Sequence, residues 1–229
     1  MINNYDIIIL IIATDNKDYY INMQKVWKLY MNTHPKIKAF FIKGNININE
    51  NIVLEQNNDI INVKCQESFI PGILIKTIES FKYIYNNYNF KYIYRTNLSS
   101  FIDLNKLYKW AINNSINYSA IIGSYKGIKF GSGSGFFLSK ECVNYLINKD
   151  NIDYNKYIDD VAIGNMLIPK YSITPNKRTN FVDFDTKKIT NDEIKKNDVF
   201  HFRCKNSSNM NRTVYNLERM YELIYKNNL

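Results

Sequence analysis

Histidine, cysteine, proline and glycine are all scarce in this chain of 229 residues, which contains two, three, four and eight of them. The three cysteines, Cys65, Cys142 and Cys204, are odd in number and form no Cys-x-x-Cys pair. They therefore argue against a disulfide framework and against a structural zinc site. Two histidines offer little for a histidine-based metal site. The fold must instead rest on a hydrophobic core, which a chain of this length can bury.

Long apolar runs are also scarce. The leading one, Ile7–Ala13, is too short to cross a bilayer, and no basic segment of the kind found in signal peptides precedes it. We therefore expect no membrane span and a cytoplasmic protein.

Acidic residues are outnumbered, with 21 against 30 Lys and Arg, and the formal net charge is +9. Such an excess is typical of proteins with an anionic partner, whether nucleic acid, an acidic membrane or a phosphorylated small molecule. The lysines are dispersed, with short clusters only at Lys187-Lys188 and Lys195-Lys196. Because no block of five or six like charges occurs, the sequence predicts no nucleic-acid-binding stripe.

Apolar runs and helical patterns alternate along the first half of the chain. This alternation predicts an α/β fold, in which a mostly parallel central sheet is flanked by helices, as a single domain over residues 1–229. Strands are predicted at Tyr5–Ala13, Ile37–Ile42, Ile60–Cys65, Phe90–Thr96, Ala120–Tyr125 and Val199–Lys205, with a short one after the glycines of Phe130–Glu141. Helices are predicted over Tyr20–Tyr30, Ile73–Tyr85, Ser100–Trp110, Asp159–Leu167 and Val214–Tyr225, and from Glu141 to about Asn148, and residues 168–198 are expected to be irregular.

In open α/β sheets a ligand binds beyond the carboxyl ends of the strands, so the polar residues that follow each strand are the first candidates. These are Thr14-Asp15, Glu67-Ser68, Arg95–Ser100 and His201–Lys205. No G-x-G-x-x-G follows the first strand, and the chain has no Walker A sequence and no G-x-S-x-G elbow. These absences exclude dinucleotide-binding, P-loop and α/β-hydrolase sites.

Four segments resemble motifs of the inverting GT-A glycosyltransferases of the Fringe and β-1,3-galactosyltransferase type, in the same order and over most of the chain. Glu67–Ser80 is similar to the "DSY-x-N-L-x-x-K-T" stretch, and Tyr92–Leu104 to a strand that leads into the metal-binding "DDD-x-F" motif. Gly131–Ser139 resembles the "SGGGYVLS" loop, and Ile158–Leu167 the "EDV-x-x-G" motif.

The resemblance implies a GT-A fold and a hexosyltransferase that moves a sugar from a nucleotide-sugar donor, a UDP-sugar, to a glycan acceptor with inversion, giving a β-linkage. It implies that Asp160 is the catalytic base beside Asp159, and that Gly133, Ser134 and Gly135 contact the acceptor. Two alternatives stay open. Asp159 and Asp160 could simply cap their helix, and the glycines could form a flexible loop or a bulge.

Asn97, Leu98 and Ser99 stand where the family has the acidic DxD ligands of its metal ion. None of the three can supply a carboxylate to Mn²⁺ or Mg²⁺, so we expect no cofactor and a metal-independent reaction, with a divalent metal ion such as Mn²⁺ as the alternative. Charge stabilisation of the departing diphosphate would then fall to cations and hydroxyls of the protein. The residues expected to bind the donor are Thr14, Arg95, Asn97, Ser99, Ser100, His201, Arg203 and Lys205.

Several of these residues also have a structural interpretation. Ser100 could be the N-cap of the following helix, and His201 could be a satisfied histidine in an apolar strand. Trp27 and Trp110 lie on helical patterns and are expected in the core.

Two other functions stay open beside the enzyme. The lost DxD acids motivate a GT-A domain that binds sugar or nucleotide without turnover. The net charge alone motivates a nucleic-acid-binding module.

Overall fold

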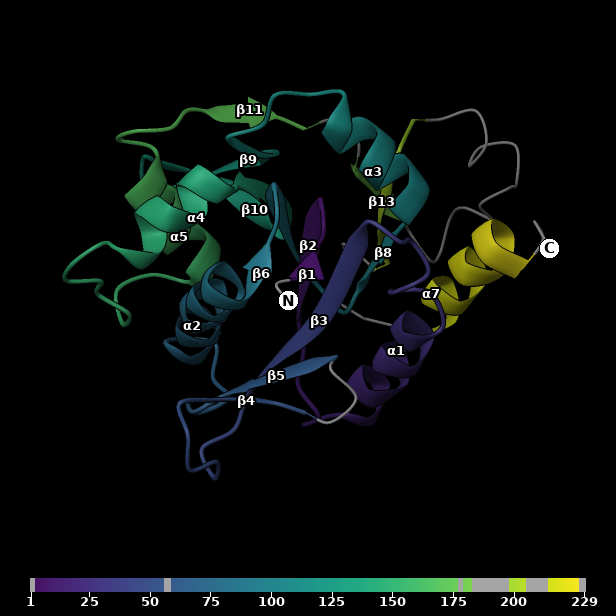
Figure 1. The fold of residues 1–229 in the computed structure, drawn as a ribbon, viewed down its shortest axis with the longest axis horizontal. Helices are drawn as coiled ribbons and strands as arrows, with labels where there is room; N and C mark the ends of the chain where they lie inside the picture. Colours follow the sequence, from purple (N-terminus) through teal and green to yellow (C-terminus); the bar gives the residue numbers. More distant parts are fainter. Residues whose placement is uncertain (1–2, 56–58, 177–178, 183–197, 205–213, 227–229) are drawn as a thin grey trace.

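A computed structural model describes residues 3–55, 59–176, 179–182, 198–204 and 214–226. The sheet lies between two layers of helices (Figure 1): α2, α4 and α5 cover one face, and α1, α3 and α7 cover the other. This is the α/β architecture that the sequence predicts.

Eight strands form the central sheet in the order β11-β9-β10-β7-β2-β3-β5-β4. Its centre, β7-β2-β3-β5, is parallel throughout, and β9 and β11 also pair in parallel. Antiparallel pairing is confined to β10 with its two neighbours and to the edge strand β4. The sheet is therefore mostly parallel, as predicted.

The central position of strand β2 (Ile7–Ile12) explains why its sequence is continuously apolar. Successive side chains of a strand point to opposite faces, and both faces of this strand are covered. Ile7, Ile9 and Ile11 pack in the cluster below α1, α3 and α7, whereas Ile8 and Leu10 pack against α2, α4 and α5. Such two-sided burial is typical of central parallel strands.

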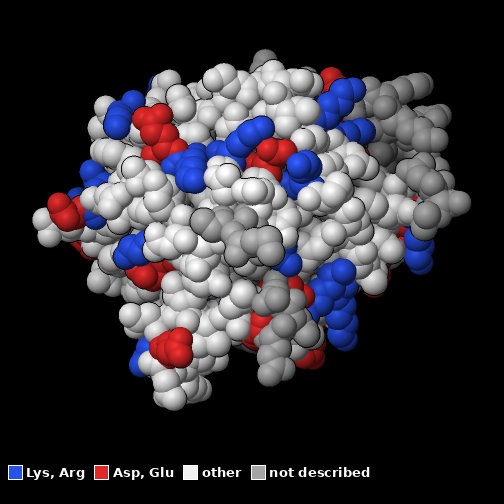
Figure 2. Space-filling view, in the orientation of Figure 1, with Lys and Arg blue, Asp and Glu red and all other residues white. Residues whose placement is uncertain are grey.

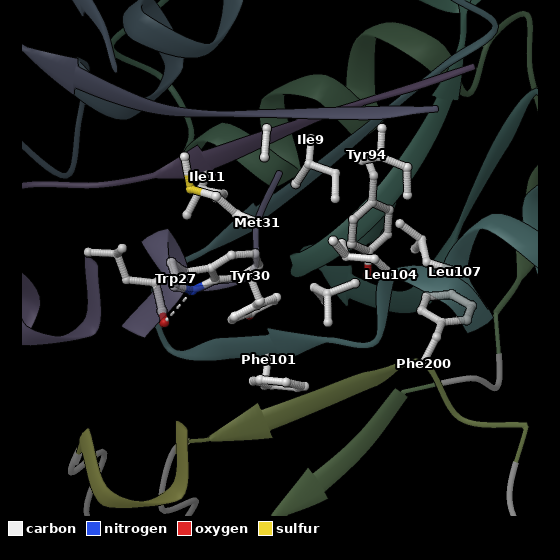
Figure 3. Packing of buried hydrophobic residues seen from close by; sticks show 14 of the residues in the cluster. Ile9, Ile11, Trp27, Tyr30, Met31, Tyr94, Phe101, Leu104, Leu107 and Phe200 are labelled. Carbon is white, nitrogen blue, oxygen red and sulfur yellow. Dashed lines mark hydrogen bonds between the residues drawn. The ribbon is translucent and has the colours of Figure 1, made fainter. Parts of the chain in front are cut away.

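Aromatic side chains fill the first of these clusters (Figure 3). Trp27 and Tyr30 of α1 stack at 5.1 Å between ring centroids, and Tyr30 lies 4.7 Å from Phe101. The Trp27 indole N–H donates to the Leu98 carbonyl at 3.1 Å. The predicted core position of Trp27 is confirmed, and this bond fixes the turn that follows β7. Trp110 packs partly buried against Phe137 and Phe200.

A second, three-stranded sheet has the order β12-β13-β8. Strand β8 (Ser100–Ile102) follows β7 after a two-residue turn and pairs antiparallel with β13 (His201–Cys204), so that Arg203 lies opposite Ser100. This pairing places the late strand β13 beside the residues that follow β7, at the carboxyl edge of the central sheet.

Local differences from the sequence prediction have clear causes. The helix expected from Ser100 begins at Leu104, because Ser100 belongs to β8, and Asp103 is the N-cap that accepts from the Lys106 N–H. The glycines of the Phe130–Glu141 segment lie inside one long strand, β10, which bulges between Gly131 and Phe136. Part of the segment expected to be irregular forms the strands β11 and β12, which pair with distant strands.

The elements have the following bounds. The strands are β1 Asn3–Asn4, β2 Ile7–Ile12, β3 Ile37–Gly44, β4 Ile52–Leu54, β5 Ile60–Val63, β6 Tyr88–Asn89, β7 Tyr92–Asn97, β8 Ser100–Ile102, β9 Tyr118–Tyr125, β10 Ile128–Ser139, β11 Ile173–Pro175, β12 Thr179–Val182 and β13 His201–Cys204. The helices are α1 Asp18–Lys28, α2 Gly72–Asn87, α3 Leu104–Ile112, α4 Lys140–Ile147, α5 Asp159–Leu167 and α7 Val214–Tyr221, which continues as a π-helical turn over Glu222–Lys226. None of the helices in the described part of the chain has the length and apolar character needed to cross a bilayer.

Candidate active site

A cavity of about 620 Å³ opens at the carboxyl ends of β2 and β7. The loop between β5 and α2, the bulged part of β10, the start of α5 and strand β13 complete its wall. The lining residues are Ile12, Ala13, Thr14, Asn16, Tyr20, Glu67, Ser68, Phe69, Ile73, Lys76, Arg95, Asn97, Leu98, Ser99, Ser132, Gly133, Ser134, Ile158, Asp159, Asp160 and Arg203. The edge of the sheet predicted to bind a ligand therefore does carry a cavity.

The main chain of Gly133, on the β10 bulge, is the centre of a polar network. Its N–H donates to Asp160 Oδ2 at 2.7 Å. Its carbonyl accepts from the Arg95 guanidinium and, at 3.0 Å, from Asn97 Nδ2. A side chain would not fit here, because a Cβ at position 133 would lie 2.9 Å from Asp160 Oδ2 and 3.0 Å from Arg95 Nη1.

Arg95 and Asp159 form a buried ion pair on the cavity wall. The Arg95 guanidinium, 3% exposed, donates to Asp159 Oδ2. The Arg95 guanidinium also lies over the Phe136 ring, 5.5 Å from its centroid. These contacts occupy the Arg95 cation with protein partners, whereas the sequence predicts a phosphate ligand.

Asp160 lies in the first turn of α5, where a carboxylate faces the positive end of the helix. Ile158 holds the N-cap position, so neither acid is the N-cap residue. Burial raises the pKa of the Asp160 carboxyl, and the neighbouring Asp159 adds to the rise, while the Gly133 N–H and Arg95 oppose it. A carboxylate with a raised pKa that lines a cavity is suited to accept a proton.

Arg203 extends from β13 to the cavity wall beside Asn97. Its guanidinium donates to Asn97 Oδ1 and, at 3.1 Å, to Ser100 Oγ, and the side chain is 7% exposed in total. Burial lowers the pKa of Arg203 to about 10, so the group stays a cation at neutral pH. Among the described residues no carboxylate lies within ion-pair distance of it. A buried cation without a counterion is costly, and an anionic ligand would offset that cost.

Asn97, Leu98 and Ser99 do not offer the ligands that a divalent metal ion prefers. Asn97 Oδ1 already accepts from Arg203, and Leu98 is buried with its carbonyl bonded to Trp27. Ser99 contributes only a neutral hydroxyl, which donates to Asn97 at 3.1 Å. Hard cations prefer several ionised oxygens, and within the described ranges no three His, Cys, Asp or Glu side chains gather into a metal-binding group.

The buried Lys76 and the more exposed Glu67 form a second ion pair, and of the two only Glu67 comes just after a predicted strand. Lys76 Nζ donates to Glu67 Oε1 at 2.6 Å and to the Ala13 carbonyl at 2.8 Å. The Gly44 N–H also donates to Glu67, so this pair joins the ends of β2, β3 and α2. Both residues belong to the motif-like segment Glu67–Ser80, but the ion pair between them appears only in the folded structure. The aromatic side chains of Tyr20 and Phe69 line the same cavity. Phe69 stands in the motif-like segment Glu67–Ser80, whereas Tyr20 belongs to no motif that would have marked it.

Nine predicted site residues line the cavity together: Thr14, Arg95, Asn97, Ser99, Gly133, Ser134, Asp159, Asp160 and Arg203. Three do not line it. Ser100 is fully buried and bonds Arg203, and Gly135 faces the Tyr94 hydroxyl. His201 is fully buried with its Nδ1 2.8 Å from that hydroxyl, and burial lowers its pKa to about 3. The structure thus places the His201 ring against Tyr94 and not on the cavity wall, where the sequence predicts a phosphate contact. Lys205 lies outside the described residues.

No protein-family model matches this sequence, and no curated protein matches it. A solved structure does: a glycosyltransferase involved in the glycosylation of the major capsid of PBCV-1 is similar at a TM-score of 0.50 and 10% identity, covering 95% of this chain and 99% of that one. The galactosyltransferase LgtC, in complex with donor and acceptor sugar analogs, is similar at a TM-score of 0.48 and 15% identity, covering 96% of this chain and 95% of that one. A putative glucose-1-phosphate thymidylyltransferase from Bacillus anthracis is similar at a TM-score of 0.42 and 8% identity, covering 75% of this chain and 86% of that one. At such identity the likeness to the capsid glycosyltransferase concerns the fold alone, and this chain has a GT-A-like α/β fold.

Proposed function

We propose that the protein is a glycosyltransferase that moves a sugar from a nucleotide diphosphate sugar, a UDP-sugar by the sequence resemblance, to a hydroxyl of a glycan. The observation that carries the proposal is the Arg203 cation, which is buried at the cavity, bonded only to neutral groups among the described residues, and shares the cavity with Asp160. An anion at Arg203 and a proton acceptor at Asp160 are the two functions that glycosyl transfer needs. The GT-A-type fold supports the same reaction class.

The proposed reaction is a single displacement. The acceptor oxygen bonds to the anomeric carbon, the bond between that carbon and the diphosphate oxygen breaks, and the nucleoside diphosphate leaves with the electron pair. Asp160 takes the proton of the acceptor hydroxyl, and Arg203 stabilises the charge of the leaving diphosphate, aided by the Ser99 hydroxyl and Thr14. Direct attack inverts the anomeric carbon, so an α-linked donor gives a β-glycoside in this proposal.

Ligand-induced stabilisation tests donor binding. We expect a nucleotide diphosphate sugar to raise the melting temperature of the protein, because it binds only the native state, and EDTA to leave that rise unchanged. A charge-assisted hydrogen bond contributes about 1.5–3 kcal/mol, so Arg203→Gln should weaken the donor by about ten- to hundredfold. Arg219→Gln on α7, outside the cavity, is the matched control. Loss of binding in EDTA would contradict the metal-independent form of the proposal.

Turnover tests the role of Asp160. Asp160→Asn keeps the shape of the side chain and should keep donor binding, but it should lose about 10²–10⁴-fold in rate because the proton acceptor is gone. The exposed Asp153→Asn should behave like the parent. The anomeric configuration of the product, read by NMR, checks the inversion. An active Asp160→Asn enzyme would remove Asp160 from the mechanism.

A GT-A domain that binds nucleotide sugar without turnover is the second candidate. The Asn97-Leu98-Ser99 replacement favours it, since the family's acidic ligands are gone. Donor binding in the parent without transfer to any glycan would establish it. Nucleic-acid binding has less support: Figure 2 shows blue and red side chains interspersed on the visible face, without a continuous basic stripe. An electrophoretic shift at physiological salt would test that function.

A further inference from the structure

Arg95 stands where the sequence predicts a phosphate ligand, yet its hydrogen bonds go to other parts of the protein. One guanidinium nitrogen donates to Asp159 and another to the Gly133 carbonyl. The planar guanidinium can hold two acceptors in fixed directions, which an ammonium group cannot do. Arg95 thereby joins three elements: its own strand β7, the bulge of β10 and the first turn of α5.

The two partners of Arg95 flank the proposed catalytic base on both sides. Asp159 precedes Asp160 in α5, and the N–H of Gly133 donates to Asp160 Oδ2 at 2.7 Å. The other oxygen, Oδ1, accepts from the Val161 N–H at 2.9 Å. Any shift of Asp159 or of the Gly133 peptide is therefore transmitted to the Asp160 carboxylate.

We propose that Arg95 is a positioning residue for the transfer reaction: by holding Asp159 and the Gly133 carbonyl together, it fixes the Asp160 carboxylate at the cavity wall, and it does not bind the diphosphate. This inference rests on the proposed role of Asp160. It also divides the cations of the cavity by function. Lys76 is paired with Glu67 and Arg95 with Asp159, which leaves Arg203, among the described lining residues, to meet the anion.

The charges around Asp160 make this role measurable. Asp159 on α5 raises the pKa of Asp160, and Arg95 on β7 lowers it. Tyr118 on β9 stays neutral because burial raises the pKa of its phenol. Replacing Arg95 by Met leaves the Asp159 carboxylate unpaired beside Asp160. The pKa of Asp160 should then rise further. In Asp159→Asn the like charge is gone and the Arg95 cation remains, so the pKa of Asp160 should fall.

The experiment titrates the full-length protein carrying ¹³C-labelled aspartate carboxyls, with the Asp160 signal assigned by its loss in Asp160→Asn. We expect a higher pKa for Asp160 in Arg95→Met and a lower one in Asp159→Asn. This readout needs no turnover. If the parent proves inactive, the proposed function fails, while the titration still tests whether Arg95 acts on Asp160 through Asp159 and the Gly133 peptide.

Kinetics separate positioning from phosphate binding. In Arg95→Met, kcat should fall at least tenfold, the acid limb of the pH profile should move upward, and the donor Kd should stay within twofold. Arg95→Lys keeps the charge and should restore the acid limb but only part of kcat. The double variant Arg95→Met/Asp159→Asn removes both buried charges and replaces Arg95→Met in this test if that single variant does not fold. We expect the double variant to fold and to bind donor with the parental Kd, but to have the same low kcat as Arg95→Met.

Two results would overturn the proposal. One is an unchanged Asp160 pKa in folded Arg95→Met or, if that variant does not fold, a double variant with parental kcat. The other is a donor Kd raised tenfold or more with kcat and the pH profile unchanged, which would make Arg95 a diphosphate ligand after all.

Discussion

At the scale of single residues, the Gly133 peptide is the most constrained point of the cavity wall. It bonds Asp160, Arg95 and Asn97 with its two main-chain polar groups, and the space above its Cα is already filled by the first two. The strand bulge on which it lies frees these groups from β-ladder pairing, since a bulge leaves its extra residue unpaired.

Gly133→Ala should therefore act mainly on the reaction. The added methyl group displaces the Asp160 carboxylate, because it would otherwise lie 2.9 Å from Oδ2. A misplacement near 1 Å costs about 10²-fold in rate, so we expect a loss of that order in kcat with donor affinity unchanged. Steady-state kinetics beside calorimetric donor binding measure both quantities. A Gly133→Ala enzyme with parental kcat would contradict the assignment of Asp160 as the base.

Phe69 is the second residue whose position is informative, because its large apolar side chain is 67% exposed while it lines the cavity. Such a ring gains by stacking on a flat ligand group, an interaction of about 1–3 kcal/mol for a nucleobase. Phe69→Ala should weaken nucleotide-sugar binding about tenfold or more and leave the melting temperature unchanged. Ile46→Ala is the control, since Ile46 is 66% exposed outside the cavity. Equal affinities in the two variants would exclude stacking by Phe69.

At the scale of elements, the site depends on how closely helix α5 approaches strand β10. Gly164 makes this approach possible, because a Cβ there would lie 2.4 Å from Phe130 Cβ and 2.7 Å from its Cα. The close contact brings the first turn of α5, with both aspartates, against the bulge. Gly164, which stands at the glycine position of the "EDV-x-x-G"-like segment, thus has a packing role in this chain.

Gly164→Ala places two effects in opposition. Alanine favours a helix over glycine by about 1 kcal/mol, whereas overpacking costs about 1–3 kcal/mol. Since backbone atoms of β10 stand in the way, we expect the second to win, lowering both the free energy of unfolding and kcat. The neighbouring exposed Asn165→Ala should gain helix propensity without the clash and be neutral or slightly stabilising. Denaturant titration distinguishes them, and a stabilised Gly164→Ala would refute the close packing.

At the scale of the whole molecule, His201 couples stability to pH. It is enclosed where the three-stranded sheet meets the central one, with its ring bonded to Tyr94 of β7. Burial lowers the pKa of His201 to about 3 from the ordinary value of 6.5. Between these two values the unfolded chain binds one more proton than the folded one, so stability falls as the pH falls below 6.5.

This loss amounts to about 1.4 kcal/mol per pH unit for one proton. His201→Gln removes the titrating group, and its free energy of unfolding should therefore depend less steeply on pH between 6.5 and 4.5. His34→Gln should keep most of the parental slope, because His34 is only partly buried. Urea unfolding across this range measures all three proteins. Identical slopes in parent and His201→Gln would show that His201 takes up its proton equally in the folded and the unfolded state, which would contradict the lowered pKa.

The sequence by itself determined the order of the main strands and helices and the edge of the sheet where the cavity lies. Continuous apolar runs such as Ile7–Ile12 report burial on both faces, and the polar residues after them must collect at the carboxyl ends of parallel strands. These are local properties, so periodicity reveals them. The start of α5 at Asp159 was predicted for the same reason, whereas the start of α3 was not, because Ser100 pairs with β13 and so belongs to a strand.

The tertiary structure alone decided which charges are paired. Arg95, Arg203 and His201 look equally able to meet a phosphate when they are read along the chain. Arg95 pairs with Asp159, which is 64 positions away in the sequence, and Arg203 bonds Asn97, which is 106 positions away. Side-chain partners at such separations depend on strand pairing and on helix packing, and neither leaves a local pattern. The difference between a buried neutral histidine, a paired arginine and an arginine without a counterion among the described residues therefore appears only once the sheets are assembled.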